Sequence, residues 1–119
     1  MLEYSQRLRD HTRNALAAPN ASTGRTLFDA ALKGGAQSMN QPVGAIAPGF
    51  RADICVLDAE HPALIGRRGD AALDSWIFSG GNPCVRDMIV AGAHVVKDRA
   101  HIREADIERR FRSAVKRLA

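Results

Sequence analysis

The sequence predicts an α+β chain. Apolar residues recur at helical spacing near both ends, and the middle holds short runs rich in Val and Ile that Gly and Pro residues separate. The 119 residues, 45% hydrophobic and 25% charged, have the composition of one globular domain. Aromatic residues make up only 5%, so the core must be small and mostly aliphatic. If its hydrophobic faces do not complement one another within the chain, a partner is missing.

Two helices are predicted in the first 43 residues. Residues 2–16 carry a thin apolar stripe among Arg, Asp and Gln, so this helix needs a partner. Residues 17–20 break it. Three hydroxyl residues are candidate N-caps of the second helix: Ser22, Thr23 and Thr26. Gly34 and Gly35 mark either a close contact with a neighbouring helix or the end of this helix. Because the apolar spacing continues beyond them, we predict the close contact.

A buried β-strand is predicted over residues 54–57. These four apolar residues lie between Asp53 and Asp58. Because the two aspartates are five positions apart, they point to opposite faces of the strand, which excludes simple paired-carboxylate catalysis. We interpret both as capping the strand. A polar loop rich in Gly and Arg follows over residues 59–72.

A β-hairpin is predicted from residues 85–90 and 93–96. Both runs are rich in β-formers, and Gly92 between them supplies the positive φ that a tight turn needs. Before the hairpin, residues 73–78 fit either a strand or a helical turn. The Gly-Gly-Asn-Pro sequence at 80–83 then forces a turn.

The last predicted helix covers residues 103–119 and has one clean apolar stripe, formed by Ile107, Phe111, Val115 and Leu118. The net charge of +4 comes from a surplus of basic residues in this helix and in the first one. Acidic residues are interleaved with the basic ones, which is typical of a solvated helix face with pairs four residues apart. Because the basic face lacks stacking aromatics, nucleic acid is only a weak alternative partner.

The sequence contains no self-sufficient active site. The four histidines, His11, His61, His94 and His101, form no metal-binding spacing, and we interpret His94 and His101 as exposed residues near a hairpin end. Cys55 and Cys84 lack any second cysteine at motif spacing and are predicted to be buried thiols. Motifs of nucleophile elbows and phosphate loops are also absent. We therefore assign no catalytic, cofactor-binding or metal-binding residue in this chain.

Targeting signals are also missing from the sequence. No basic-then-apolar signal segment opens it, and no apolar run approaches the roughly 18 residues of a membrane span. We expect a cytoplasmic protein without membrane contact. The Asn20-Ala21-Ser22 triplet is then a loop followed by a helix cap rather than a glycosylation site.

One motif resembles a known family. Residues 48–58, PGFRADICVLD, resemble the Pro-Gly-x-x-Ala-Asp-(apolar)-Val-Leu-Asp signature near the C-terminus of metal-dependent amidohydrolases. Residues 27–36 resemble the last barrel helix of that family, and residues 85–96 resemble its closing hairpin. Within the superfamily, residues 2–9 (LEYSQRLR) and 73–81 (LDSWIFSGG) are most similar to the formimidoylglutamate deiminases.

This resemblance implies a division of the chain and a reaction for the whole enzyme. Residues 1–43 would be the C-terminal helices of an incomplete TIM-type barrel, residues 44–102 part of the accessory β-sandwich domain, and residues 103–119 a C-terminal helix. The whole enzyme would convert N-formimino-L-glutamate to N-formyl-L-glutamate and ammonia in histidine degradation. Zinc or another divalent metal would activate the water. The family's metal-binding and catalytic residues precede the matching region, so none maps onto this chain, which we expect to be inactive alone.

The missing barrel strands should leave four apolar residues without partners: Leu8, Leu16, Leu27 and Phe28. Exposed apolar surface of this kind favours self-association, so we expect a homo-oligomer or a partly disordered first helix. Two alternatives remain at this point. The chain could come from another amidohydrolase, such as a guanine deaminase or a chlorohydrolase relative, which share the Pro-Gly signature. It could also be a non-catalytic β-domain that acts as an interaction module.

Overall fold

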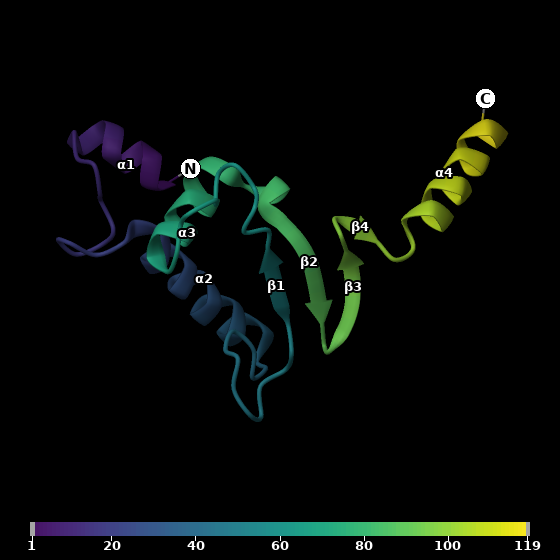
Figure 1. The fold of residues 1–119 in the computed structure, drawn as a ribbon, viewed down its shortest axis with the longest axis horizontal. Coiled ribbons are helices and arrows are strands. Elements are labelled where there is room, and N and C mark those ends of the chain that lie inside the picture. The colour runs from purple at the N-terminus through teal and green to yellow at the C-terminus, as the bar shows by residue number, and fades with distance from the viewer. Residues whose placement is uncertain (1, 119) are drawn as a thin grey trace.

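A computed structural model describes residues 2–118 as helices at both ends of a four-stranded antiparallel sheet (Figure 1). The strands follow one another in the order β1-β2-β3-β4, so each strand pairs with its neighbour in sequence. The prediction of an α+β chain is confirmed. No helix among the described residues is long and apolar enough to cross a membrane.

The first helix, α1 (Leu2–Asp10), is shorter than predicted. Continuation to residue 16 is wrong because His11 adopts a left-handed φ of 52° and the chain turns back. The buried Glu3 carboxylate holds this turn. Its Oε1 accepts hydrogen bonds from Arg7 Nε (2.8 Å) and from the backbone amide of Ala15 (3.2 Å). The loop after the helix is thus tied to the first turn of the helix.

The second helix, α2 (Thr23–Met39), begins at one of the three candidate caps. Ser22 accepts a hydrogen bond from the amide of Arg25 (2.9 Å) and is the N-cap. The helix ends where Asn40 takes a left-handed φ of 49°. Gly34 and Gly35 lie inside the helix, as predicted, but a methyl group added at either would meet no described atom within 4 Å. The predicted close helix contact is therefore not made within residues 2–118.

A third helix, α3 (Asp70–Ser75), continues into a π-helical turn (η1, Trp76–Gly80), and a 3-10 turn (η2, Asn82–Cys84) follows. The helical alternative for residues 73–78 is therefore correct. Phe28 of α2 packs edge-on against the Trp76 ring, with centroids 5.8 Å apart. This aromatic contact positions the π-helical turn against α2.

A single carboxylate joins α2 to α3. Asp74 Oδ1 accepts from Ser22 Oγ (2.9 Å) and from the amide of Gly24 (2.7 Å). An added side chain at Gly24 would lie 2.9 Å from the Asp74 Cα, so only glycine permits this approach. On the exposed side, Arg25 Nε donates to Asp70 (2.9 Å). These polar contacts fix the angle between the two helices.

The sheet contains the predicted hairpin and one strand more. β1 (Ile54–Leu57) pairs with β2 (Val85–Val90), which pairs with β3 (Ala93–Lys97) through a turn in which both Ala91 and Gly92 have positive φ. The chain turns again at Asp98 and Arg99, with φ of 48° and 68°. The strand β4 (Ala100–His101) follows this turn and pairs with β3. It was not predicted, because a strand of two residues is too short to show an alternation of apolar and polar side chains.

The strand predicted to be buried is instead half-exposed. Ile54, Val56 and Leu57 are intermediate in exposure, and Cys55 is exposed. The prediction of a buried Cys55 is therefore wrong, whereas Cys84 is fully buried as expected. The reason is that no second layer covers this part of β1 within the described chain. Leu64 and Cys84 are the hydrophobic residues that residues 3–118 bury almost completely.

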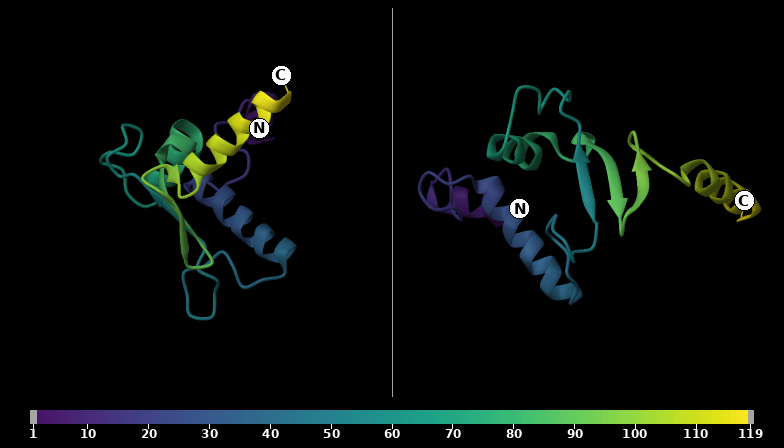
Figure 2. Two further views of the ribbon diagram at one scale, coloured as in Figure 1. Left: turned by 90° about the vertical axis from the view of Figure 1, so that its right-hand side faces the viewer. Right: turned by 60° about the horizontal axis from the view of Figure 1, so that its bottom comes forward.

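The molecule is open and extended. Its radius of gyration is 18.1 Å, whereas a compact domain of this length has about 13–14 Å. Its accessible surface is 9105 Å², against about 6,300 Å² for a compact monomer of this mass. The fourth helix, α4 (Glu104–Leu118), stands away from the sheet (Figure 1 and the right view of Figure 2). Along it Glu108 pairs with Arg112, which confirms the predicted solvated face.

Two glycine-to-alanine substitutions in α2 should have opposite effects. Gly24→Ala should lower the free energy of unfolding by about 1–3 kcal/mol, because the new methyl group collides with the Asp74 backbone. Gly34→Ala meets no neighbour and should raise it by about 0.5–1 kcal/mol through helix propensity. Urea unfolding followed by circular dichroism measures both. Equal effects of the two substitutions would contradict the described packing of α2 against α3.

Candidate functional site

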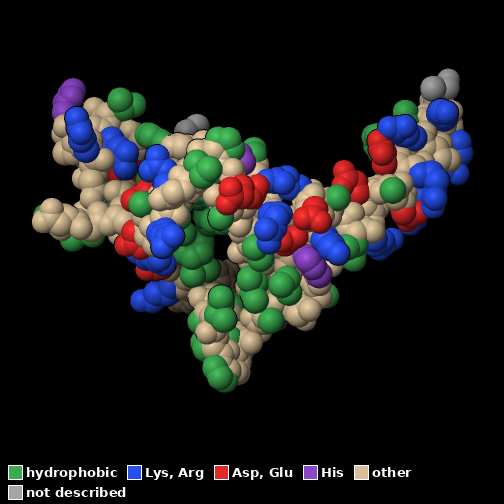
Figure 3. Space-filling model, viewed as in Figure 1, with side chains coloured by type: hydrophobic (Ala, Val, Ile, Leu, Met, Phe, Trp, Pro, Cys, Tyr) green, Lys and Arg blue, Asp and Glu red, His purple; other side chains and the backbone are tan. Residues whose placement is uncertain are grey.

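An apolar hollow lies beside β1. It encloses about 220 Å³ and lies between α2, the loop at residues 44–46, β1 and the π-helical turn. Phe28, Leu57 and Trp76 are among its lining residues. Figure 3 shows hydrophobic side chains around this hollow, between the α2 side of the molecule and the sheet. Asp53 is the one charged residue that lines it among the described residues. The hollow suits the aliphatic side chains of a covering segment better than it suits a polar substrate.

The two aspartates that flank β1 bond to backbone at its ends. Asp53 accepts from the amide of Ala91 (2.7 Å), which anchors the β2–β3 turn. Asp58 accepts from the amide of Glu60 (3.0 Å), in the turn that follows the strand. The interpretation of both residues as strand caps is confirmed. Neither carboxylate faces the other, so the pair supports no acid–base chemistry.

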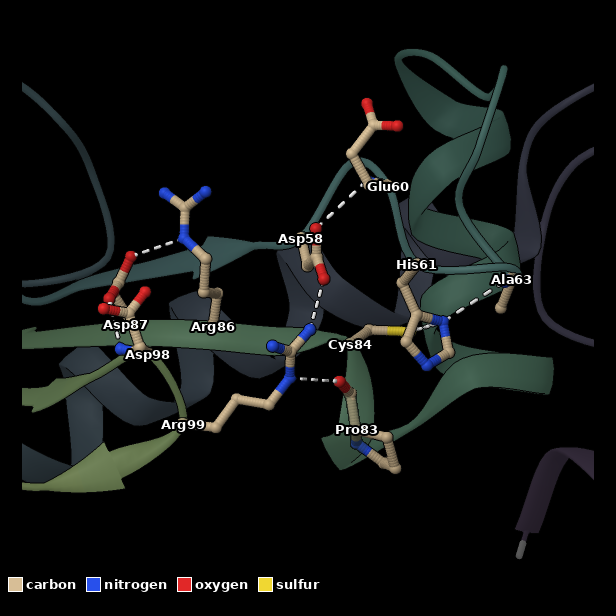
Figure 4. Close-up of polar contacts among 10 residues, drawn as sticks. All are labelled: Asp58, Glu60, His61, Ala63, Pro83, Cys84, Arg86, Asp87, Asp98 and Arg99. Carbon is tan, nitrogen blue, oxygen red and sulfur yellow. Dashed lines mark hydrogen bonds and ion pairs between the residues drawn. The ribbon is translucent and has the colours of Figure 1, made fainter.

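A polar cluster joins the loop after β1 to the end of the hairpin (Figure 4). The Arg99 guanidinium pairs with the Asp58 carboxylate and donates to the carbonyl of Pro83 (3.4 Å). The amide of Glu60 and then the Arg99 guanidinium hold the pKa of Asp58 below its usual value. The cluster therefore ties together the start of the loop after β1 (Asp58), the 3-10 turn η2 (Pro83) and the turn between β3 and β4 (Arg99).

A histidine and a cysteine meet beneath this cluster. His61 Nδ1 lies 3.3 Å from Cys84 Sγ and also accepts from the amide of Ala63 (3.2 Å). Which of Nδ1 and the Cys84 thiol donates in this contact depends on the tautomer of His61. The sulfur is fully buried, so it has no access to a substrate. The sequence does not reveal this contact, because 23 residues separate the partners and no motif links them.

The carboxylate of Asp87 is the centre of a second polar cluster on the hairpin (Figure 4). It accepts from Arg86 Nε (2.8 Å) and from the amide of Asp98 (3.0 Å), and His94 Nε2 lies 3.3 Å away. The Arg86 guanidinium, helped by the Asp98 amide, lowers the pKa of Asp87 to about 2. Only 8% of this residue is exposed. His94 is exposed, as predicted, and pairs with Asp87 on the outside of the hairpin.

The described residues do not assemble a ligand set for a metal. Among residues 2–118, no group of three or more His, Cys, Asp or Glu side chains is arranged to hold one. His94 and His101 remain on the surface of the hairpin, and the half-buried His61 is committed to Cys84. The metal that the amidohydrolase resemblance implies therefore does not fit this part of the chain, and we derive no catalytic step through it.

Comparison with known proteins supplies the context for these clusters. No family model matches the chain. Over 111 residues, or 92% of its length, the chain is 51% identical to a formimidoylglutamate deiminase from Pseudomonas aeruginosa. This chain matches the C-terminal quarter of a formimidoylglutamate deiminase. The resemblance predicted from residues 2–9, 48–58 and 73–81 is thus confirmed.

A solved structure agrees with this match. The crystal structure of an amidohydrolase from Brucella melitensis covers 98% of the chain at 40% identity, with a TM-score of 0.78. The chain spans 24% of the curated deiminase and 25% of the solved amidohydrolase. An arrangement similar to this open one therefore occurs inside an amidohydrolase about four times as long.

The Asp87 cluster makes stability depend on pH in the acidic range. Because folding lowers the pKa of Asp87 to about 2, its contribution is complete above the ordinary pKa of about 4 and is lost as the pH falls towards 2. The free energy of unfolding of the wild type should exceed that of Asp87→Asn at pH 6, and the two should converge by about pH 2. Urea titrations over this range measure the difference.

The matched control is Asp98→Asn, which keeps the backbone amide that bonds to Asp87. At every pH, the free energy of unfolding of Asp98→Asn should lie closer to that of the wild type than the free energy of unfolding of Asp87→Asn does. A constant gap between the wild type and Asp87→Asn from pH 6 to 2 would contradict the assigned role of this carboxylate.

Proposed function

We propose that this chain is the C-terminal scaffold of a metal-dependent deiminase that converts N-formimino-L-glutamate to N-formyl-L-glutamate and ammonia. The observation that carries the proposal is the 51% identity to a formimidoylglutamate deiminase, which covers 92% of this chain and 24% of that protein. It favours this interpretation over a guanine deaminase or chlorohydrolase relative and over a non-catalytic module. In this proposal the chain itself contributes no catalytic, cofactor-binding or metal-binding residue.

The proposed division of labour follows the elements. Residues 1–43 would supply the last helices of the catalytic barrel, residues 44–102 part of the accessory β-sandwich domain, and residues 103–119 a terminal helix. The hollow between α2 and β1 would then lie at the junction of barrel and accessory domain. Its apolar lining supports this placement, because a junction inside one protein is closed by apolar packing.

Buried acceptors on α1 also support a longer polypeptide. Glu3 is only 4% exposed, yet its Oε2 atom has no hydrogen-bond donor among the described residues, and neither does Gln6 Oε1. A buried acceptor without a donor costs about 1–3 kcal/mol, so such atoms are rare in complete structures. In the whole enzyme, donors from the preceding part of the barrel would satisfy them.

Exposed apolar residues mark the surfaces that the rest of the enzyme would cover. Leu8 and Leu16 are exposed, as expected, whereas Leu27 and Phe28 are half-buried because α3 and Trp76 partly cover α2. The ligands of the divalent metal, zinc or another ion, would come from that missing part. We also propose that the protein is cytoplasmic, and that this chain, while its apolar surface is uncovered, associates with copies of itself.

A graft tests whether this chain supports catalysis. The matched C-terminal quarter of the Pseudomonas aeruginosa deiminase is replaced by this chain, and ammonia release from N-formimino-L-glutamate is measured. We expect kcat/KM within about tenfold of the unaltered enzyme, because a scaffold that keeps its packing preserves the position of catalytic groups held elsewhere. The isolated chain should release no ammonia.

Two controls make the result decisive. The same deiminase cut at the graft boundary should be inactive, and a graft carrying Phe28→Ala should lose stability because it removes the ring that packs on Trp76. A graft that does not fold, or that folds and binds metal but releases no ammonia, would contradict the proposal.

A further inference from the structure

The outermost helix, α4, carries an apolar stripe that nothing in the described chain covers. Its four members are exposed by 52% (Ile107), 67% (Phe111), 46% (Val115) and 89% (Leu118). Figure 3 shows the helix projecting from the body, with basic side chains along it. An amphipathic helix gains most of its stability by packing its apolar face, so this stripe requires a partner surface.

Three of the four members are symmetric about Phe111, whereas Leu118 lies outside this symmetric part and would face Glu104 of a copy. Ile107 lies four residues before Phe111, and Val115 lies four residues after it. If a second α4 runs in the opposite direction across the same face, Phe111 meets its own copy and Ile107 meets Val115. The face is therefore complementary to itself through a two-fold axis, which is the geometry of an isologous interface.

The charges of α4 favour the antiparallel direction. Acidic residues occupy the first third of the helix, at Glu104, Asp106 and Glu108. Basic residues occupy the remainder, at Arg109, Arg110, Arg112, Lys116 and Arg117. An antiparallel pair places the acidic start of each helix beside the basic end of the other, whereas a parallel pair places like charges together. Within residues 2–118, Glu104, Lys116 and Arg117 have no ion-pair partner and remain available for this contact.

We propose that α4 pairs with the α4 of a second copy of this chain, antiparallel and centred on Phe111. A 15-residue helix is about 22 Å long, so the contact is smaller than a standard interface of about 1,600 Å² and the dimer of the isolated chain is weak. The inference depends on α4 alone. It stands or fails independently of the proposed deiminase scaffold, which the graft tests by ammonia release.

Sedimentation equilibrium of the full 119-residue chain over about 1–200 μM tests the pairing. The wild type should be in monomer–dimer equilibrium, and Phe111→Asp should weaken the dimer at least tenfold by placing two charges at the axis. The control is Ile65→Asp, which alters a residue of similar exposure (60%, against 67% for Phe111) outside α4 and outside the hollow, and should leave the dimer unchanged within about twofold. Circular dichroism checks that each variant keeps its helices.

Spin labels test the direction. In a Cys55→Ser background, in which the buried Cys84 does not react, labels at Glu104→Cys should lie at least about 20 Å apart in the dimer, and labels at Ser113→Cys about 10 Å. A parallel pair would give similar short distances at both positions and would overturn the proposal. A wild type that stays monomeric at about 200 μM would also overturn it, and would leave α4 to be covered by another part of the enzyme. Equal weakening by Phe111→Asp and Ile65→Asp would overturn it as well.

Discussion

The Asp74 carboxylate joins two parts of the molecule that apolar packing holds only weakly. It bonds to Ser22 at the start of α2 and to the amide of Gly24, while Phe28 and Trp76 add the main apolar contact between the same elements. On the sheet, Asp87 has the corresponding role at the hairpin. Polar contacts of this kind set the positions of elements, but they bury little apolar surface. The helices and the sheet are therefore held in place around faces that remain open.

The apolar hollow beside β1 carries little polar chemistry among the described residues. The polar clusters around Asp58, Cys84 and Asp87 are each satisfied by neighbouring turns and backbone amides, and none presents an unengaged nucleophile or base to the apolar hollow. Together with the match to a quarter of a deiminase, this supports the proposal that the chain serves as a scaffold. The hollow beside β1 and the unsatisfied Glu3 oxygen both indicate where further polypeptide would pack.

Local patterns in the sequence predicted the elements well, and contacts between distant residues limited the prediction. Helical spacing and the Gly92 turn identified α2, α4 and the hairpin, because each depends on neighbouring residues. The end of α1 depends on a bond from Ala15 to Glu3, which no local pattern reveals. The exposure of Cys55 was missed for a different reason. An apolar run indicates a strand that becomes buried, but no described residue covers this part of β1.

Alkylation of Cys55 tests the central claim most directly, since this residue lines the hollow and is exposed here. The rate is measured in the isolated chain and in the same residues grafted onto the preceding part of the Pseudomonas aeruginosa deiminase, with the buried Cys84 as the internal standard. The account predicts at least about tenfold slower modification of Cys55 in the longer protein, because the missing layer covers the hollow. An unchanged rate in a folded graft would show that no such layer forms and would contradict the scaffold interpretation.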